Sequence, residues 1–331
     1  MRKTEYKSNE ETDAVVEAVR MREVIGVDIG GTAIKGLVAD EAGTILAEAE
    51  RETEARLGRD TILAQLHSLV EELLAGHPAV KALGIASAGR INADSGEVVY
   101  ATGNLPGWQG VQLTQWAEAA FGRPAAADND ANAALLGEAW LGAGRGRQSL
   151  VMLTLGTGVG GANMAAGQLL RGAAWSGGDW GHSVLVPDGR LCNCGKRGCV
   201  EQYVSGRALL RLAMEETGRV YTHGREVVAA AEQGDAAALA VLERFTADLA
   251  QVTANIGAAV DPELIIIGGG VIQSRAVWWP LLAGKAGGEL AGRIVPAELG
   301  NRAGCLGAAR LALERPRRDN DCCGKEEREH G

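Results

Sequence analysis

Residues 24–36 have the sequence VIGVDIGGTAIKG, a short apolar run that ends at two adjacent glycines. Such a run predicts a buried strand over 24–29 followed by a tight turn. Further strands are predicted over 34–39 and near 44–50, which gives an antiparallel hairpin series. Because adjacent glycines let backbone N–H groups come close to a ligand, the turn indicates a phosphate site, with an ordinary hairpin turn as the alternative.

The same order of an apolar strand and a glycine turn occurs twice more. Residues 150–161 read LVMLTLGTGVGG, and residues 264–270 read LIIIGGG. This recurrence favours phosphate binding over three unrelated hairpins, although the turns match neither a P-loop nor a GxGxxG fingerprint. Between them we expect one more strand, 82–86, and several helices with apolar residues at helical spacing. The predicted helices span 60–75, with Asp60 near the N-cap, 131–140, 208–216, 224–232 and 236–259.

Two halves that each open with a strand and a glycine turn predict an α/β protein of two lobes with a ligand cleft between them. We expect a small lobe over residues 23–127 and a larger lobe over 128–314. The last helix of the larger lobe can pack back on the small lobe. Charged residues dominate both ends, so 1–22 is interpreted as an N-terminal extension and 315–331 as a polar tail.

The composition of the 331 residues limits the classes of function. The 47 glycines are about twice the usual ~7%, and the net charge of −9 disfavours a nucleic-acid partner held by a basic surface. No run approaches the ~20 apolar residues of a membrane helix, and residues 1–22 lack the apolar core of a signal peptide. We therefore expect a cytoplasmic protein with no membrane partner.

The glycine turns supply groups that suit a nucleotide and its metal ion. Asp28 is placed to hold a hydrated Mg²⁺, Lys35 adds a cation, and the Thr32 hydroxyl adds a donor beside the backbone N–H groups. A nucleoside can lie across the bare backbone of the third turn. The residues predicted to bind the nucleotide and Mg²⁺ are Asp28, Gly30, Gly31, Thr32, Lys35, Gly156, Thr157, Gly158, Gly160, Gly268, Gly269 and Gly270.

Residues 128–134 read DNDANAA and precede a helix of small residues. One of these polar residues is explained by an N-cap, which is the simplest interpretation of the segment. Three in a row exceed what capping needs. A carboxylate at a helix start near the lobe junction is well placed to orient a sugar hydroxyl and to take its proton.

His182, Cys192, Cys194 and Cys199 provide one imidazole and three thiols within eighteen residues. A Cys₃His set is typical of a structural zinc site with no open coordination position. Cysteines clustered beside glycines indicate a metal site rather than a disulfide framework. The alternatives are another metal ion or redox chemistry.

These motifs together resemble the ROK family. Gly181-His182, nine residues and then CNCGKRGCVE (192–201) are similar to its signature, and the motifs at 28–35, 129–133, 156–161 and 268–270 stand in the family order. The resemblance covers about residues 23–314. It implies the ribonuclease H-like fold of the sugar-kinase, heat-shock ATPase and actin superfamily. Family members are bacterial sugar kinases, sugar-responsive repressors and the kinase half of the animal enzyme of sialic acid synthesis.

The resemblance also implies roles for individual residues around a sugar. Asp130 resembles the general base that takes the proton of the sugar 6-hydroxyl, and Asn129 resembles a residue that holds neighbouring hydroxyls. His182 resembles a residue that both ligates zinc and hydrogen-bonds the sugar. Glu201 resembles a second sugar contact. Zinc would thus fix one wall of the sugar pocket.

Three more segments carry sugar contacts by the same resemblance. Gly89 and Arg90 match a loop that faces the sugar C2 substituent, and Asn104, in NLPGW (104–108), is a weaker match. Asp179 stands where family kinases usually carry glutamate. Because aspartate is shorter by one methylene, a direct contact with sugar hydroxyls can become water-mediated, or the pocket can favour another sugar.

The resemblance implies an ATP-dependent kinase for the 6-hydroxyl of a hexose or an N-acylhexosamine, with ATP, Mg²⁺ and structural Zn²⁺, in a homodimer or homotetramer. The loop SAGRIN (87–92) is more similar to that of N-acetylmannosamine kinases, so this sugar is slightly favoured, with glucose as the alternative. A sugar-responsive repressor is disfavoured because only about 22 residues precede the first strand. A non-catalytic sugar-binding regulator is the third hypothesis.

Overall fold

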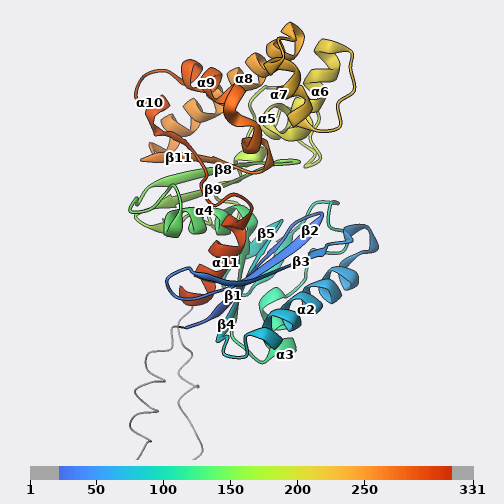
Figure 1. Cartoon of the computed structure of the whole chain (residues 1–331), viewed down its shortest axis with the longest axis vertical. Coiled ribbons are helices and arrows are strands. Elements are labelled where there is room, and N and C mark those ends of the chain that lie inside the picture. Colours follow the sequence, from blue (N-terminus) through green and yellow to red (C-terminus); the bar gives the residue numbers. More distant parts are fainter. Residues whose placement is uncertain (1–21, 315–331) are drawn as a thin grey trace, which may run out of the picture.

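The computed structural model describes residues 22–314 as two lobes, each built on a mixed five-stranded sheet (Figure 1). The sheet of the small lobe has the order β3-β2-β1-β4-β7. β1 is antiparallel to β2 and parallel to β4, and β2 is antiparallel to β3, which confirms the predicted hairpin series. Its strands are β1 (Val24–Ile29), β2 (Ala33–Ala39), β3 (Ile45–Glu52), β4 (Ala82–Ser87) and β7 (Ala125–Asn129).

The sheet of the larger lobe repeats this plan, in the order β10-β9-β8-β11-β12. β8 is antiparallel to β9 across the second glycine turn and parallel to β11, which runs into the third. The predicted two-lobed α/β architecture is therefore confirmed. The strands are β8 (Leu150–Leu155), β9 (Val159–Ala165), β10 (Gln168–Leu169), β11 (Leu264–Gly268) and β12 (Ile294–Pro296).

Two helices and a short hairpin complete the small lobe. They are α2 (Arg59–Gly76), α3 (Leu113–Phe121), and β5 (Arg90–Asn92) paired with β6 (Glu97–Tyr100), together with the 3₁₀ turn η1 (Ala55–Leu57). The N-cap of α2 is Gly58 and makes no side-chain cap, so the expectation of Asp60 near the N-cap is wrong by two positions. Asp60 instead lies in the first turn, where a carboxylate interacts favourably with the helix dipole.

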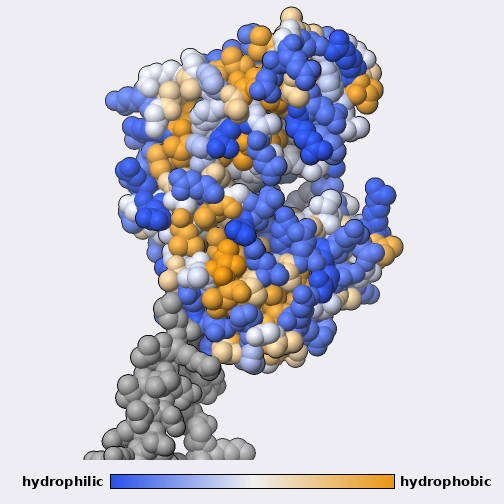
Figure 2. Space-filling model, in the orientation of Figure 1, coloured by the Kyte–Doolittle hydropathy of each residue, from blue (hydrophilic) through white to orange (hydrophobic). Residues whose placement is uncertain are grey.

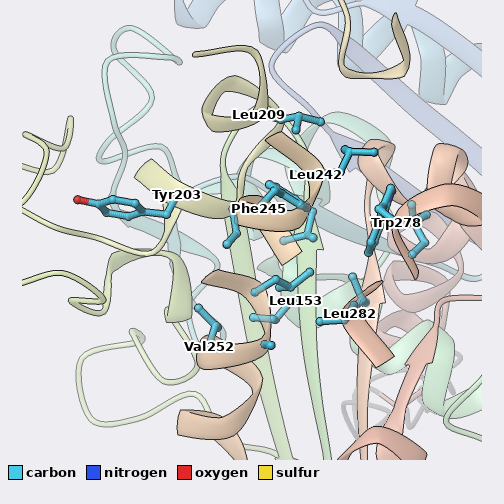
Figure 3. Packing of buried hydrophobic residues seen from close by; sticks show 14 of the residues in the cluster. Leu153, Tyr203, Leu209, Leu242, Phe245, Val252, Trp278 and Leu282 are labelled. Atoms are coloured by element: carbon cyan, nitrogen blue, oxygen red, sulfur yellow. The ribbon is translucent and has the colours of Figure 1, made fainter. Parts of the chain in front are cut away.

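The helices of the larger lobe cover its sheet on the side away from the small lobe (Figure 1). The N-cap of α8 is Asp235, whose carboxylate accepts hydrogen bonds from two backbone N–H groups, and the apolar face of α8 buries Phe245. Figure 3 shows Phe245 with Trp278, Leu282 and Leu153 in the core of this lobe. The helices are α5 (Glu201–Val204), α6 (Gly206–Thr217), α7 (Gly224–Glu232), α8 (Ala236–Val260), α9 (Arg275–Ala286) and α10 (Gly288–Arg293).

α4 (Asp130–Leu141) and α11 (Ala303–Glu314) lie between the two sheets and pack on each other (Figure 1). Their approach requires glycine, because a Cβ on Gly307 would lie 1.6 Å from the carbonyl oxygen of Ala133. α11 also packs on the small-lobe sheet, where a Cβ on Gly84 would lie 1.7 Å from the carbonyl oxygen of Ala308. These contacts place the N-termini of both helices at the junction of the lobes.

Glu138, in the last turn of α4, fixes the segment that leads into α11. Its side chain is fully buried, and its carboxylate accepts hydrogen bonds from the backbone N–H groups of Ala143 (2.8 Å), Glu298 (3.2 Å) and Leu299 (2.8 Å).

Glu138→Ala is therefore expected to lower the free energy of unfolding by about 3 kcal/mol or more, because it leaves several backbone donors without a partner. Glu138→Gln, which keeps one acceptor oxygen, should cost less. Urea unfolding measures both variants, with the exposed Glu216→Ala as control. A Glu138→Ala protein as stable as the control would contradict this role.

Candidate active site

A cavity of about 250 Å³ lies at the junction of the lobes. Its wall comes from β1 and β2 of the small lobe, from β8 and β11 of the larger lobe, and from the N-terminal ends of α4 and α11. Figure 2 shows a mostly hydrophilic surface with an indentation between the lobes on the right. Of the predicted functional residues, the wall contains Asp28, Gly30, Thr32, Lys35, Asp130, Gly268 and Gly269.

The first glycine turn joins β1 to β2 beside this cavity. Asp28 and Lys35 are opposite each other in the antiparallel register, so both side chains belong to the same face of the sheet. Thr53, just beyond β3 and fully buried, holds the turn from outside. Its hydroxyl donates to the carbonyl of Gly30 (2.6 Å), and its backbone N–H donates to the carbonyl of Thr32 (3.0 Å).

Asp28 lies in a crowded environment at the end of β1. The N-terminus of α11 approaches it so closely that a Cβ on Gly304 would lie 2.3 Å from Asp28 Oδ2. Burial, and then the nearby Asp130 carboxylate, raise the pKa of Asp28 from its ordinary 3.8 to about 7, while Lys35 opposes this shift. Two carboxylates in one cavity with one lysine form a site that attracts a divalent cation.

Asp28→Asn is expected to flatten the pH dependence of stability in the protein without nucleotide or Mg²⁺. A carboxyl group whose pKa is raised by folding contributes stability below its ordinary pKa, and this contribution is lost as the pH rises through about 7. Between pH 4 and 8 the free energy of unfolding of the wild type should therefore fall more than that of Asp28→Asn. The difference should be at most several kcal/mol, since each pKa unit corresponds to about 1.4 kcal/mol.

Urea unfolding of the wild type and Asp28→Asn at a series of pH values measures this difference. Asp94→Asn, at an exposed position in the β5–β6 turn, is the matched control. Parallel stability curves for the wild type and Asp28→Asn would contradict a raised pKa of Asp28.

The second and third glycine turns lie side by side in the larger lobe. A Cβ on Gly269, whose φ is +86°, would lie 2.5 Å from the carbonyl oxygen of Leu155, which immediately precedes the second turn. The second turn is closed by a bond from the Gly156 N–H to the Gly158 carbonyl (3.0 Å), and Gly160 lies against Ala131 of α4. Five predicted members of the three turns, Gly31, Thr32, Thr157, Gly269 and Gly270, are exposed.

Asp130 is the first residue of α4 and is held there by Asn129. The Asn129 side-chain oxygen accepts from the N–H groups of Ala131 (2.9 Å) and Asn132 (3.2 Å), so Asn129 is the N-cap. Its amide nitrogen donates to Asp130 Oδ1 (2.8 Å) and to the carbonyl of Gly89 (2.8 Å). Burial raises the pKa of Asp130 above its ordinary value, although the hydrogen bonds that its carboxylate accepts from the Ala131 N–H and the Asn129 amide oppose the shift. A carboxylate of raised pKa is a better proton acceptor.

Arg90 and Asp179 form an ion pair between the lobes. Arg90 Nη2 donates to Asp179 Oδ2 (3.2 Å), and the guanidinium lies over the Tyr100 ring, 5.2 Å from its centroid. The pair joins β5 of the small lobe to the residue that precedes the 3₁₀ turn η2 (Trp180–His182). Asn104, in contrast, is exposed in the turn between β6 and α3, and it is not part of the cavity wall.

The donor atoms of His182, Cys192, Cys194 and Cys199 all lie within 4.8 Å of one another. His182 Nδ1 is 3.6 Å from Cys192 Sγ, and Cys194 Sγ is 3.6 Å from Cys199 Sγ. Tetrahedral zinc with these ligand types separates its donor atoms by roughly 3.5–3.8 Å. The four residues therefore fit a structural zinc ion, with Nδ1 of His182 toward the metal position and Nε2 on the other side of the ring.

Glu201 follows this cluster directly, at the start of α5. Its carboxylate accepts a hydrogen bond from the Val159 N–H (3.1 Å), and a Cβ on Gly158 would lie 2.1 Å from Glu201 Oε2. Glu201 thus supports the second glycine turn and connects it to the cysteine cluster.

Known proteins match nearly all of the described chain. The model of the ROK family matches residues 24–315. The chain belongs to the ROK family. The glucokinase of Thermotoga maritima is 35% identical over 311 residues, 88% of this chain and 98% of the relative. The N-acetyl-D-glucosamine kinase of Citrobacter koseri is 34% identical over 266 residues, 76% of this chain and 85% of the relative.

A solved ROK structure has the same fold. The ROK family glucokinase from Streptomyces griseus, in complex with glucose and AMPPNP, superposes with a TM-score of 0.78 at 34% identity. The match covers 88% of this chain and all of the other. The fold that the ROK motifs imply is thereby confirmed. Within residues 22–314, no helix is both long and apolar enough to cross a membrane.

Two contacts that support the site residues of this ROK protein are not indicated by its sequence motifs. Thr53 supports the first glycine turn from 21 positions beyond Thr32, and no motif includes it. Arg171, just after β10, donates to the buried carboxylate of Asp128 (2.7 Å). The sequence gives one sign that Asp128 has a role of its own: three consecutive polar residues, 128–130, are more than an N-cap needs.

Proposed function

We propose that this ROK protein is an ATP-dependent kinase that phosphorylates the 6-hydroxyl of glucose. The observation that carries the proposal is the position of Asp130, which shares one cavity with Asp28 and with glycine turns from both lobes. A sugar and an ATP bound in this cavity would therefore contact both the proposed base and the proposed phosphate site. Sequence similarity to glucokinases of the same length and fold supports the same activity.

In the proposed reaction, Asp130 accepts the proton of the 6-hydroxyl as its oxygen attacks the γ-phosphorus. A bond forms between the sugar oxygen and phosphorus, the bond to the bridging β,γ-oxygen breaks, and ADP leaves. Asn129 holds the Asp130 carboxylate in one orientation through its amide donor. Phosphoryl transfer depends mainly on such positioning and on neutralising phosphate charge.

The phosphates would lie against the glycine turns, where the donors are the Thr32 and Thr157 hydroxyls and turn N–H groups other than those of Gly30 and Gly156, which bond within their turns. Asp28 would hold hydrated Mg²⁺, which neutralises the charge that develops on the phosphates. Lys35 adds a positive charge beside the same turn. The His182–Cys199 cluster would hold a zinc ion that takes no part in the transfer and fixes the adjoining backbone.

One finding supports glucose over the N-acetylmannosamine favoured by the sequence of residues 87–92. Glucokinases stand among the similar relatives at 35% identity. Asp179, the shorter acid, reaches Arg90 of the other lobe.

Initial rates of ADP release with a panel of sugars test the proposal. Glucose should give the highest kcat/KM, ahead of mannose, N-acetylglucosamine and N-acetylmannosamine. A higher kcat/KM for an N-acylhexosamine would reject glucose and keep the kinase. Sugar binding by calorimetry without ADP release from any sugar would reject the kinase and indicate a sugar-binding regulator.

A further inference from the structure

Asp128 is a buried acid one residue before the N-cap of α4. Its side chain is 0% exposed, yet both carboxylate oxygens are occupied. Oδ1 accepts from the Asn129 N–H (2.7 Å) and from Asn132 Nδ2 (2.8 Å), and Oδ2 accepts from Arg171 Nε (2.7 Å). A buried carboxylate stays ionised only with such compensation.

These bonds connect Asp128 to the proposed base. Asn129 caps α4 and donates to Asp130 Oδ1, so the orientation of Asp130 depends on the position of Asn129. Asp128 fixes the Asn129 backbone from one side and the Asn132 side chain, one helical turn along, from the other. The start of α4 is therefore held by a charge that Arg171 balances.

Arg171 itself is anchored on the larger lobe, although Asp128 belongs to the small-lobe sheet. The Leu170 N–H donates to the Asn163 carbonyl of β9 (2.8 Å), and the Gly177 N–H donates to the Arg171 carbonyl (2.8 Å). This closes the base of the 170–178 loop. The backbone of Arg171 is thus fixed on the larger lobe, and its guanidinium extends to Asp128 of the small-lobe sheet.

We propose that Arg171 is a positioning residue for Asp130, acting through Asp128 and Asn129. This inference rests on the proposed role of Asp130 as the base. The charge of Arg171 is the essential property, because it balances the charge of the buried Asp128 carboxylate and holds that side chain in place. Without it, the buried Asp128 carboxylate lacks a balancing charge and must move toward water, which releases the Asn129 N–H and misplaces Asp130.

The experiment is a double-mutant cycle of Arg171→Met and Asp128→Asn. Arg171→Met should lower kcat about tenfold or more, since small misplacements of a reacting group are costly, while KM for ATP changes less than about twofold. Asp128→Asn keeps an acceptor oxygen but removes the charge, and it should lower kcat about threefold. The double variant should return to the Asp128→Asn level, because no buried charge then lacks a partner. Arg171→Lys should stay close to wild type.

Arg244→Met, which removes an exposed ion pair on α8, is the matched control and should keep wild-type kcat. A merely structural Arg171 would lower the urea midpoint without lowering kcat in the folded protein, and this result would overturn the proposal. A double variant with multiplied losses would overturn it as well.

The amide resonances of Ala131 and Asn132 in ¹⁵N-labelled protein give a readout without turnover. They should shift in Arg171→Met and return to the Asp128→Asn positions in the double variant. Unchanged resonances in Arg171→Met would overturn the positioning role. If the wild type releases no ADP with any sugar, the proposed function fails, and these resonances still decide whether Arg171 orients the start of α4.

Discussion

Asp130→Asn is expected to lower kcat for glucose phosphorylation by about 10²–10⁴-fold, which corresponds to roughly 3–5 kcal/mol of transition-state stabilisation. The amide keeps the shape of the side chain and an oxygen that accepts from Asn129 Nδ2, but it cannot accept the proton of the 6-hydroxyl. Glucose and AMPPNP should still bind within about threefold of the wild-type Kd, because the cavity wall is unchanged.

Steady-state rates and calorimetry on the same preparation separate these two effects. Asp94→Asn, an exposed substitution in the β5–β6 turn, should behave as the wild type. An Asp130→Asn protein with more than about a tenth of the wild-type kcat would remove Asp130 from the role of base. A parallel loss of glucose binding would make it a binding residue instead.

Loss of zinc is expected to weaken glucose binding much more than ATP binding. The cluster ties down η2, where the His182 N–H donates to the Asp179 carbonyl (3.2 Å), so the ion pair of Asp179 with Arg90 depends on it. We expect Cys194→Ser to raise the glucose Kd at least tenfold and the ATP Kd less than about threefold, under ~0.7 kcal/mol. The first and third glycine turns lie on other strands, whereas the second is bonded to Glu201, two residues after the cluster's last cysteine.

Metal analysis and calorimetry on zinc-free, still folded protein test this selectivity. Wild type should contain one zinc per chain, Cys194→Ser should have lost it, and Cys322→Ser should retain it, although Cys322 lies outside the described residues. Equal losses of glucose and ATP affinity would mean that zinc only stabilises the fold. Full zinc content in Cys194→Ser would contradict the ligand assignment.

Much of the fold was predictable because its signals are local. Each strand with its glycine turn is continuous in sequence, and α7 has the predicted bounds of 224–232. α9 was not predicted because Pro280 interrupts its pattern. The path of α11 across the small-lobe sheet depends on contacts at Gly26 and Gly84, residues that the sequence separates from it by more than 200 positions. The predicted extension 1–22 and tail 315–331 fall almost entirely outside the described residues.

The candidate site was predictable where one motif carries one function. The four metal ligands converge as their spacing predicts, and Asp28 and Asp130 reach one cavity. Ion pairs between side chains of distant segments were not predictable, because the spacing of residues within a motif says nothing about contacts outside it. Arg171 meets Asp128 across 43 positions, and Arg90 meets Asp179 across 89. Their partners were visible in the sequence, but only the packing of the two lobes joins them.

The most direct test of the kinase assignment is to incubate the purified protein with MgATP and ¹³C-labelled glucose and to follow both products by NMR. We expect ADP and glucose 6-phosphate to appear in equal amounts, with no ADP when glucose is left out. ADP that forms at the same rate without glucose, or a phosphate on another hydroxyl, would contradict the placement of Asp130 beside the 6-hydroxyl.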